Sequence, residues 1–420
     1  MSFRFAPFFA AVSLALAAWL AWRMRPDKPV AIPPPRPPAP TLSDLGHPPD
    51  WSLLKCFEGK ITRSDFLEQI ERVFTTSPSW RDWLQVGETD LKIRTDSPNE
   101  WLRFRFAPEG SQDRPPRYWR GVNELPAAPS ERSLDGVHIA IDPGHIGGRW
   151  AEMEERWFQL PGGTPVREGD MTLQVAAILK PRLEALGATV SLVREKSDPV
   201  TASRPESLQE HAPDASGGDI AKLAQQLFYR TAEIRARAER VNQILQPDLV
   251  LCLHFNADAW GDPSAPTLVP ANHFHMILNG GYTDAELTLA DQRHELLLKL
   301  FQGVHREEKS LATHIAAAFV ERTAMPPYLY PLAAKNARNV DNNPYLWARN
   351  LLANRLYQCP VAYFEPYVMN SQEDYERIQA GDYEGLRQVG GRMRASIFRE
   401  YADCAVLGLQ RHFRQRPTTP

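Results

Sequence analysis

From Val137 onward, the hydrophobic and polar positions follow two patterns. Short apolar runs, which predict buried strands, are followed by stretches with apolar residues three or four positions apart, which predict helices. The predicted strands cover residues 137–142, 189–194, 248–255, 272–278 and, as the last one, 359–365. The predicted helices cover residues 172–186, 232–245 and 287–322, with a kink at Pro181. This alternation predicts an α/β fold with a mostly parallel, twisted sheet flanked by helices.

A smaller pattern precedes this region. Residues 65–74 have apolar residues at helical spacing, whereas residues 91–94 and 101–106 alternate like strands. Residues 50–107 are therefore predicted to form a small N-terminal α+β domain, in which no motif indicates a chemistry. A proline-rich linker, residues 108–134, connects it to a larger domain that covers residues 135–420.

The first residues form an apolar N-terminal segment. Residues 5–22 contain no charge, which is typical of a signal peptide or of a short membrane anchor. Both readings of residues 1–25 imply an exported protein, periplasmic or otherwise extracytoplasmic, and the anchor would tie it to the membrane. Residues 26–49 contain ten prolines and predict a stiff linker that would hold the folded body away from that membrane.

Charge and cysteine content narrow the class of protein. The formal net charge is −3, so no basic excess is present to neutralise nucleic-acid phosphates, and no nucleic-acid partner is expected. Four cysteines in 420 residues do not form a disulfide scaffold. Cys252 and Cys359 fall in predicted strands, where they would be buried thiols or a pair.

Residues that bind metals stand where predicted strands end. His145 follows the first strand, His254 and Asn256 stand at the end of the third, and Glu365 ends the last. Glu168 opens the first long helix. Ligands of α/β sheets bind at the carboxyl ends of strands, so these side chains are expected to meet. Two histidines and a carboxylate around an open position are typical of catalytic zinc, and a second carboxylate would take the proton of the water.

Longer motifs connect these residues to a family. The chain from Val137 to Ala402 resembles the zinc-dependent N-acetylmuramoyl-L-alanine amidases of the amidase-3 type. The matching segments, in chain order, are IAIDPGHIGG, REGDMTL, GATVSLVR, RARAERVNQILQPDLVLCLHFNAD and RLYQCPVAYFEPYVMNSQED. The chain departs from the family at the inserted Ile146 and at Pro366-Tyr367, where the family has a small residue, any residue, glycine and phenylalanine.

The resemblance implies an activity and a role for each residue. These enzymes cleave the bond between the lactyl group of muramic acid and the first L-alanine of the peptidoglycan stem, so peptidoglycan is the implied partner. The implied roles are zinc binding for His145, Glu168 and His254, catalysis for Glu365 and Arg355, and substrate binding for Asn256. The alternatives are a catalytically degenerate amidase that only binds peptidoglycan, and a zinc peptidase that cuts within the stem.

The segment between His145 and Glu168 is longer than in the family. It contains Glu152, Glu154 and Glu155, each of which could be mistaken for the ligand, but the Met-Thr-Leu helix start follows Glu168. Long inserts beside strand ends could form a lid or a wall of the site. Their aromatic residues would stack on sugar rings or pack within the inserts; these are Trp150, Trp157, Phe158 and Trp260.

Overall fold

The computed structural model describes residues 41–417, except 96–99, 112, 212–218, 263–264 and 332. The apolar segment and most of the predicted linker, residues 1–40, lie outside the described residues. In the part of the chain that is described, no helix has the length and apolarity needed to cross a membrane.

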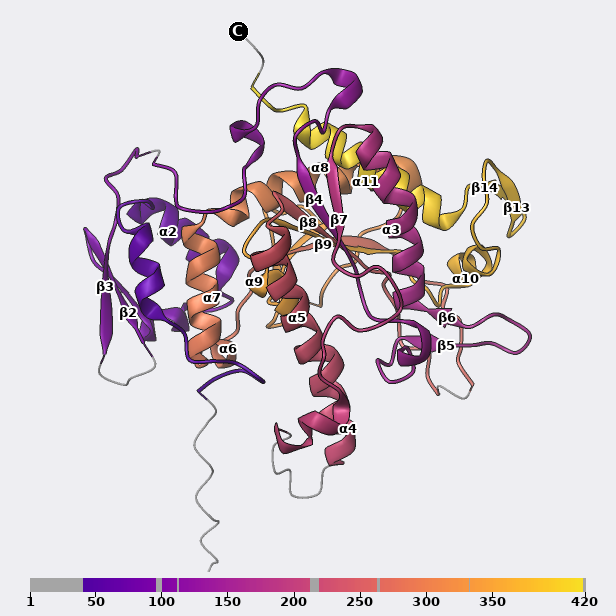
Figure 1. Ribbon diagram of the computed structural model, residues 1–420, viewed down its shortest axis with the longest axis horizontal. Helices are drawn as coiled ribbons and strands as arrows, with labels where there is room; N and C mark the ends of the chain where they lie inside the picture. The colour runs from indigo at the N-terminus through magenta and orange to yellow at the C-terminus, as the bar shows by residue number, and fades with distance from the viewer. Residues whose placement is uncertain are drawn as a thin grey trace, which may run out of the picture. The chain divides into compact units, whose positions relative to one another are not determined.

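A seven-stranded sheet forms the centre of the molecule (Figure 1), in the order β10-β11-β9-β12-β8-β4-β7. Its strands are β4 (His138–Pro143), β7 (Thr189–Leu192), β8 (Leu249–Leu253), β9 (Phe274–Leu278), β10 (Arg338–Asn339), β11 (Leu346–Ala348) and β12 (Val361–Pro366). Four of the six strand pairings are parallel, and β12 runs antiparallel to β9. The predicted mostly parallel α/β sheet is confirmed.

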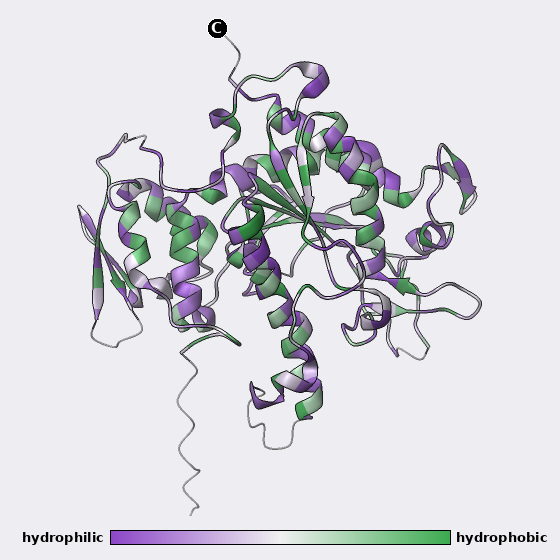
Figure 2. Cartoon of the chain, viewed as in Figure 1, coloured by the Kyte–Doolittle hydropathy of each residue, from purple (hydrophilic) through white to green (hydrophobic). Residues whose placement is uncertain are grey.

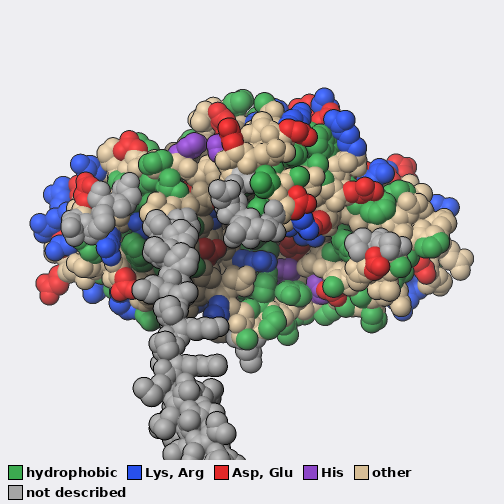
Figure 3. Space-filling model, turned by 90° about the horizontal axis from the view of Figure 1, so that it is seen from below, with side chains coloured by type: hydrophobic (Ala, Val, Ile, Leu, Met, Phe, Trp, Pro, Cys, Tyr) green, Lys and Arg blue, Asp and Glu red, His purple; other side chains and the backbone are tan. Residues whose placement is uncertain are grey.

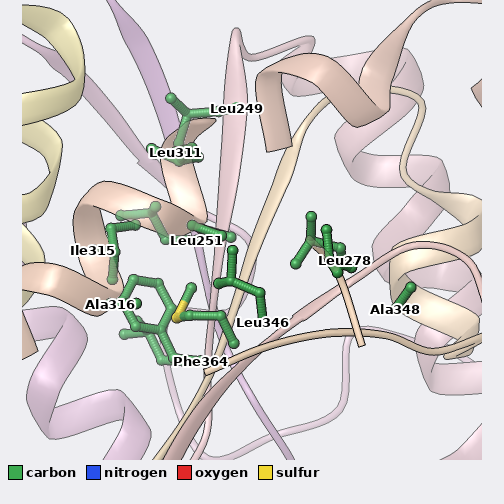
Figure 4. Close-up of a cluster of buried hydrophobic side chains, with 14 of the residues drawn as sticks. Leu249, Leu251, Leu278, Leu311, Ile315, Ala316, Leu346, Ala348 and Phe364 are labelled. Atoms are coloured by element: carbon green, nitrogen blue, oxygen red, sulfur yellow. The ribbon is translucent and has the colours of Figure 1, made fainter. Parts of the chain in front are cut away.

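Both faces of this sheet are covered. Every residue of β8 and β9 is buried, as expected for strands that read as continuous apolar runs. Figure 2 shows these central strands as largely hydrophobic, with hydrophilic residues on the outer helices. One face packs on α3 (Glu168–Ala185), α8 (Val304–Thr323) and α11 (Ile397–Phe413), and Figure 4 shows its core between Leu249 and Leu251 of β8 and Leu311 and Ile315 of α8.

The opposite face packs on a second set of helices. Val250 and Cys252 of β8 and Tyr363 of β12 share a core with Ala238 and Val241. This core is formed by α5 (Glu233–Glu239), a π-helical turn over Arg240–Leu245 and α9 (Leu352–Leu356). The preceding α4 (Ile220–Gln226) and the π-helical turn over Leu227–Ala232 pack instead with Ile146 and Trp150. The predicted helix 232–245 is thus confirmed as α5 and the π-helical turn that continues it.

The N-terminal unit is a three-stranded antiparallel sheet with a helix against it. The strands are β1 (Leu84–Val86), β2 (Asp90–Arg94) and β3 (Trp101–Arg105), and α2 (Arg63–Gln69) continues in a π-helical turn to Phe74. Phe66 and Phe104 both contact Phe301, with ring centroids 6.4 and 4.3 Å apart. Phe301 ends α7 (Ala290–Phe301), so this unit and the larger sheet share one continuous core.

Two regions differ from the predicted elements. The helical stretch 287–322 is divided into α6 (Asp284–Leu287), α7 and α8, because Gly303 adopts a left-handed conformation (φ +70°) between the last two. After β12, the last strand of the main sheet, come α10 (Gln372–Gln379) and a hairpin of β13 (Arg387–Val389) and β14 (Arg392–Arg394). The prediction that strands end at residue 365 is therefore wrong, because this short arginine-rich hairpin lacks an apolar alternation.

Candidate active site

A cavity of about 460 Å³ opens over the sheet where β4, β8 and β12 end. It is lined by the turn after β4, by the end of β8, by β12 and by residues of β9 and α5. Figure 3 shows this side of the molecule, with histidine, basic and acidic side chains close together in a hollowed region. The cavity brings together five of the six predicted site residues, namely His145, Glu168, His254, Asn256 and Glu365.

The turn after β4 is held by two buried arginines. Arg237 of α5 donates to Asp142 Oδ1 (2.9 Å), to the Pro143 carbonyl (2.9 Å) and to the His145 carbonyl (2.7 Å). Arg194 donates to the Gly169 carbonyl at 2.8 Å and more weakly to that of Pro143. These bonds fix the backbone that carries His145 against the first turn of α3. Burial lowers the pKa of Arg194 to about 10, so its guanidinium stays charged at neutral pH.

His145 itself is oriented by a carboxylate from the long insert. Glu154 is buried, accepts hydrogen bonds from the backbone amides of Ile146 and Gly147, and lies 3.5 Å from His145 Nδ1. A carboxylate on one ring nitrogen leaves the other free to bind a metal, which is the usual arrangement of a metal-binding histidine. Glu154 therefore orients His145 instead of replacing Glu168 as a ligand.

Glu168 lies between the two histidines. Its carboxylate is 3.3 Å from His145 Nε2 and 3.1 Å from His254 Nδ1, and it accepts a bond from the Phe255 amide. Burial would raise the pKa of Glu168, but the charges of His145, His254 and Arg156 outweigh it and lower the pKa to about 2. Glu168 is thus ionised at any working pH, as a metal ligand must be.

Two glycines allow this close approach. A Cβ on Gly144 would lie 2.4 Å from His254 Cε1, and a Cβ on Gly169 would lie 2.3 Å from the Gly147 amide nitrogen. Any larger residue would push the β4 turn away from β8 or from α3. The glycines of the DPGH and REGD motifs therefore explain how residues from three elements reach one point.

The donor set fits a zinc ion. Each of His145, Glu168 and His254 offers one ligand atom, and these atoms lie within 4.8 Å of one another. Ligands about 2.0–2.1 Å from a tetrahedral zinc are roughly 3.3 Å apart, close to the 3.3 Å from His145 Nε2 to Glu168 Oε2 and the 3.1 Å from His254 Nδ1 to Glu168 Oε1. Two imidazoles with one carboxylate are also the ligand chemistry of catalytic zinc, in which a fourth position stays open.

Glu365 stands in the cavity wall near the end of β12. Its partial burial raises its pKa to about 7, with Glu168 acting in the same direction and the charge of His254 opposing. Two residues earlier, the ring of Tyr363 stacks on His254, with centroids 4.5 Å apart. A carboxyl group with this pKa can both accept and release a proton near neutral pH.

Arg355 is not brought to the cavity. It lies in α9, where its Nε donates to Glu295 Oε2 at 2.5 Å and its Nη1 donates to Asn350 Oδ1 at 2.7 Å. This buried network ties α9 to α7. Asn256 does line the cavity: its Nδ2 lies 3.4 Å from His273 Nδ1, and its backbone amide bonds to the chain after β12.

Three of the four aromatic residues predicted for the inserts pack on neighbouring rings. Trp150 is buried against Phe228, and Phe158 contacts Trp260, with centroids 5.2 and 5.4 Å apart. Cys252 and Cys359 were predicted to be buried thiols or a pair, and the structure shows both as free, buried thiols.

Several cavity residues escaped the sequence analysis. Arg156 of the long insert lies 3.4 Å from Glu168, and Tyr330 and Arg349 line the far wall. No motif marked these three. Arg237 did carry a signal, because it falls on the apolar face of its helix, beside Ile234 and Val241, where a charge must have a buried partner.

The family model described as N-acetylmuramoyl-L-alanine amidase matches residues 139–389, more than half of the chain. Among curated proteins, no relative is found. Three solved structures are similar over most of their own length. The CwlD amidase of Clostridioides difficile, solved with the GerS lipoprotein, is 13% identical (66% of this chain, 98% of that chain, TM-score 0.37). Ami1 of Mycobacterium smegmatis is 15% identical (67% and 98%, TM-score 0.38), and AmiC2 of Nostoc punctiforme is 14% identical (67% and 97%, TM-score 0.34).

Proposed function

Because the chain belongs to the N-acetylmuramoyl-L-alanine amidase family and is thus an amide hydrolase of peptidoglycan, we propose that it depends on zinc and that it cleaves one particular bond. That bond is the amide between the lactyl group of N-acetylmuramic acid and L-alanine of the stem peptide. Peptidoglycan lies outside the cytoplasm, so we also propose that the protein is exported, with residues 1–25 as signal peptide or anchor.

The observation that supports this proposal most is the meeting of three candidate ligand side chains in the cavity. His145, Glu168 and His254 come from three separate elements, and their ligand atoms lie within 4.8 Å of one another. Glu154 orients one histidine, and Glu168 is held ionised. A degenerate amidase that only bound peptidoglycan would not need to keep all three candidate ligands, because loss of one histidine is enough to end catalysis.

A bound zinc would polarise the lactyl carbonyl and lower the pKa of a water to about 7. Glu365 would accept the proton of an attacking water, which its raised pKa allows, and would later pass it to the leaving amine of L-alanine. Arg156 adds positive charge beside Glu168 on the same wall. Asn256 lines the same cavity, where it would contact the substrate. The guanidinium of Arg355 has no part in this scheme, because it is bonded within the α7–α9 network.

The decisive experiment compares the purified protein with Glu365→Ala on isolated peptidoglycan. We expect the variant to keep about one zinc per chain and to lose at least a hundredfold in release of stem peptide, because the ligands are intact while the proton acceptor is gone. Zinc content by elemental analysis and product masses by mass spectrometry are the two measurements.

Glu152→Ala, an exposed glutamate of the long insert, is the matched control and should behave as wild type. Intact stems among the products support the proposed bond, whereas fragments of stems would identify a peptidase. Full activity of Glu365→Ala would refute the role of this carboxylate. Wild-type protein that binds peptidoglycan without releasing any product would identify a degenerate amidase.

A further inference from the structure

Four arginines line the cavity, and one of them differs from the rest. Three face carboxylates: Arg156 lies 3.4 Å from Glu168, Arg230 lies 3.2 Å from Glu155, and Arg237 bonds to both Asp142 and Glu233. Arg349 forms no ion pair with any residue in the described part of the chain. A half-buried guanidinium that no carboxylate of the described residues contacts within ion-pair distance keeps its N–H donors available, so it can bind an anion that arrives with a ligand.

Polar groups beside Arg349 are also left with bonding capacity. Arg349 Nη1 lies 3.5 Å from the hydroxyl of Tyr330, and that hydroxyl lies 3.2 Å from His275 Nε2. His275 is only 3% exposed and lines the cavity, yet its Nδ1 has no hydrogen-bond partner among the described residues. Burial lowers the pKa of His275 to about 3, so the ring is neutral and adds no second positive charge. Tyr328 packs against the same ring and closes this wall.

This wall stands directly beside Glu365. In the antiparallel pair of β12 and β9, Glu365 lies opposite His275, and neighbouring strands are about 4.8 Å apart. The positive charge of Arg349 also acts on Glu365, although less than burial, His254, Glu168 and Arg156 do. A substrate held at Glu365 therefore extends along this wall within a residue or two of the bond that is cleaved.

The chemistry of peptidoglycan supplies a suitable anion. Its N-acetylated sugars carry no charge, whereas the stem peptide carries free carboxylates. Arginine binds a carboxylate through two parallel N–H donors, and a tyrosine hydroxyl can add a third bond. We infer that Arg349 and Tyr330 form a subsite that binds a carboxylate of the stem peptide just beyond the cleaved amide. This inference rests on the proposed function and names the part of the substrate that sets its specificity.

Two substrates that differ in one group test the subsite. One is a muropeptide with a free stem carboxylate at the residue after L-alanine, and the other carries a carboxamide there. We expect wild-type protein to prefer the carboxylate by about 10- to 100-fold in kcat/KM, the usual effect of a charge-assisted hydrogen bond. Arg349→Gln should remove most of this preference through a higher KM, and Arg349→Lys should restore part of it.

Arg230→Gln is the control, because Arg230 lines the same cavity but is paired with Glu155, and it should keep the wild-type preference. Melting temperature and zinc content verify that each variant is folded. Equal kcat/KM of the wild type on both substrates, or an unchanged preference in Arg349→Gln, would overturn the inference and leave the proposed function standing. If neither substrate is cleaved, the proposed function fails. In that case calorimetry can measure the binding of both compounds to Glu365→Ala, and a ratio of about 10- to 100-fold between the two affinities in favour of the carboxylate would still support the subsite.

Discussion

The backbone of His145 adopts a left-handed conformation, with φ +58°, although histidine is not a residue that favours it. Such a conformation costs on the order of 1 kcal/mol or more and persists only where neighbouring groups enforce it. Here Arg237 binds the carbonyl of His145, and Glu154 binds the two amides that follow. The strain turns the imidazole out of the direction of β4 and toward Glu168.

Glu154→Gln should weaken zinc binding while the protein remains folded. The amide is the same size as the carboxylate but carries no charge for His145 Nδ1, and loss of such an orienting carboxylate typically costs about 10- to 100-fold in metal affinity. Competition with a chelator measures the affinity. Glu155→Gln, the exposed neighbour that pairs with Arg230, should leave it unchanged, and equal effects of the two variants would contradict the orienting role.

Arg237→Met should reduce the free energy of unfolding by about 3–5 kcal/mol, because it leaves Asp142 and Glu233 buried without their counter-charge. Urea denaturation measures this loss. Arg240→Met, three residues later, should cost less than about 1 kcal/mol, because among the described residues Arg240 pairs only with exposed Glu195. A loss of similar size in both variants would mean that Arg237 adds only packing.

The candidate metal ligands and the candidate proton acceptor were easier to predict from the sequence than the residues that orient them. His145, His254 and Glu365 stand immediately beside apolar runs, so their position at strand ends follows from local pattern alone. Arg237 and Arg349 act through partners that are distant in the chain, such as Asp142 and Tyr330. No local sequence pattern indicates that these residues meet in the fold. Arg355 was predicted from the family motif that leads into the last strand, and in the structure its guanidinium bonds to Glu295 of α7.

At the scale of elements, the long apolar runs were predictable and the directions of the strands were not. The strands 137–142 and 248–255 are found as β4 and β8 with shifts of one or two residues. Periodicity is the same in both directions along a chain, so the antiparallel course of β9 beside β12 could not be predicted. That course brings His275 opposite Glu365 and so forms the wall that carries the proposed subsite.

The junction of α3 with the β4 turn makes a further prediction. Gly169→Ala would bring a Cβ within 2.3 Å of a backbone nitrogen, which cannot rotate away as a side chain can. We expect a loss of about 1–3 kcal/mol in the free energy of unfolding and at least about tenfold in zinc affinity, because Glu168 moves with the helix. Thermal unfolding and chelator competition measure the two effects.

Gly408→Ala separates crowding from metal binding. Its Cβ would lie 2.5 Å from Ile315 Cα, where α11 crosses α8 far from the ligands. We expect a similar loss of stability with zinc affinity within about twofold of wild type. If Gly169→Ala also kept full zinc affinity, the close contact of α3 with the β4 turn would matter for stability alone.

At the scale of the whole molecule, one core joins the N-terminal unit to the main sheet. Phe57, Phe66 and Phe104 all contact Phe301 at the end of α7, and Phe74 contacts His305 at the start of α8 with ring centroids 6.4 Å apart. His305 is buried, and its Nδ1 has no hydrogen-bond partner among the described residues. A titratable ring thus lies at the junction that holds the two parts together.

This ring should make the molecule less stable in acid. Burial, together with the charge of Lys309 and against that of Asp341, lowers the pKa of His305 to about 4 from an ordinary value of 6.5. Between these values the unfolded chain binds a proton that the folded protein does not, so the free energy of unfolding falls as the pH falls from 6.5 to 4. One such group contributes up to about 1.4 kcal/mol per pH unit over that range, and nothing further once both states are protonated.

His305→Gln removes the titratable group. The variant should therefore lose less free energy of unfolding than wild type between pH 6.5 and pH 4, even if it is less stable at pH 7. The decisive quantity is the difference between the two proteins as a function of pH, measured by urea denaturation, because the carboxylates titrate equally in both and cancel. His211→Gln, an exposed histidine, should show the wild-type dependence. If His305→Gln runs parallel to wild type across this range, the junction takes up the proton without opening, and the acid sensitivity of the fold comes from other groups, such as the remaining histidines whose pKa burial lowers or the carboxylates.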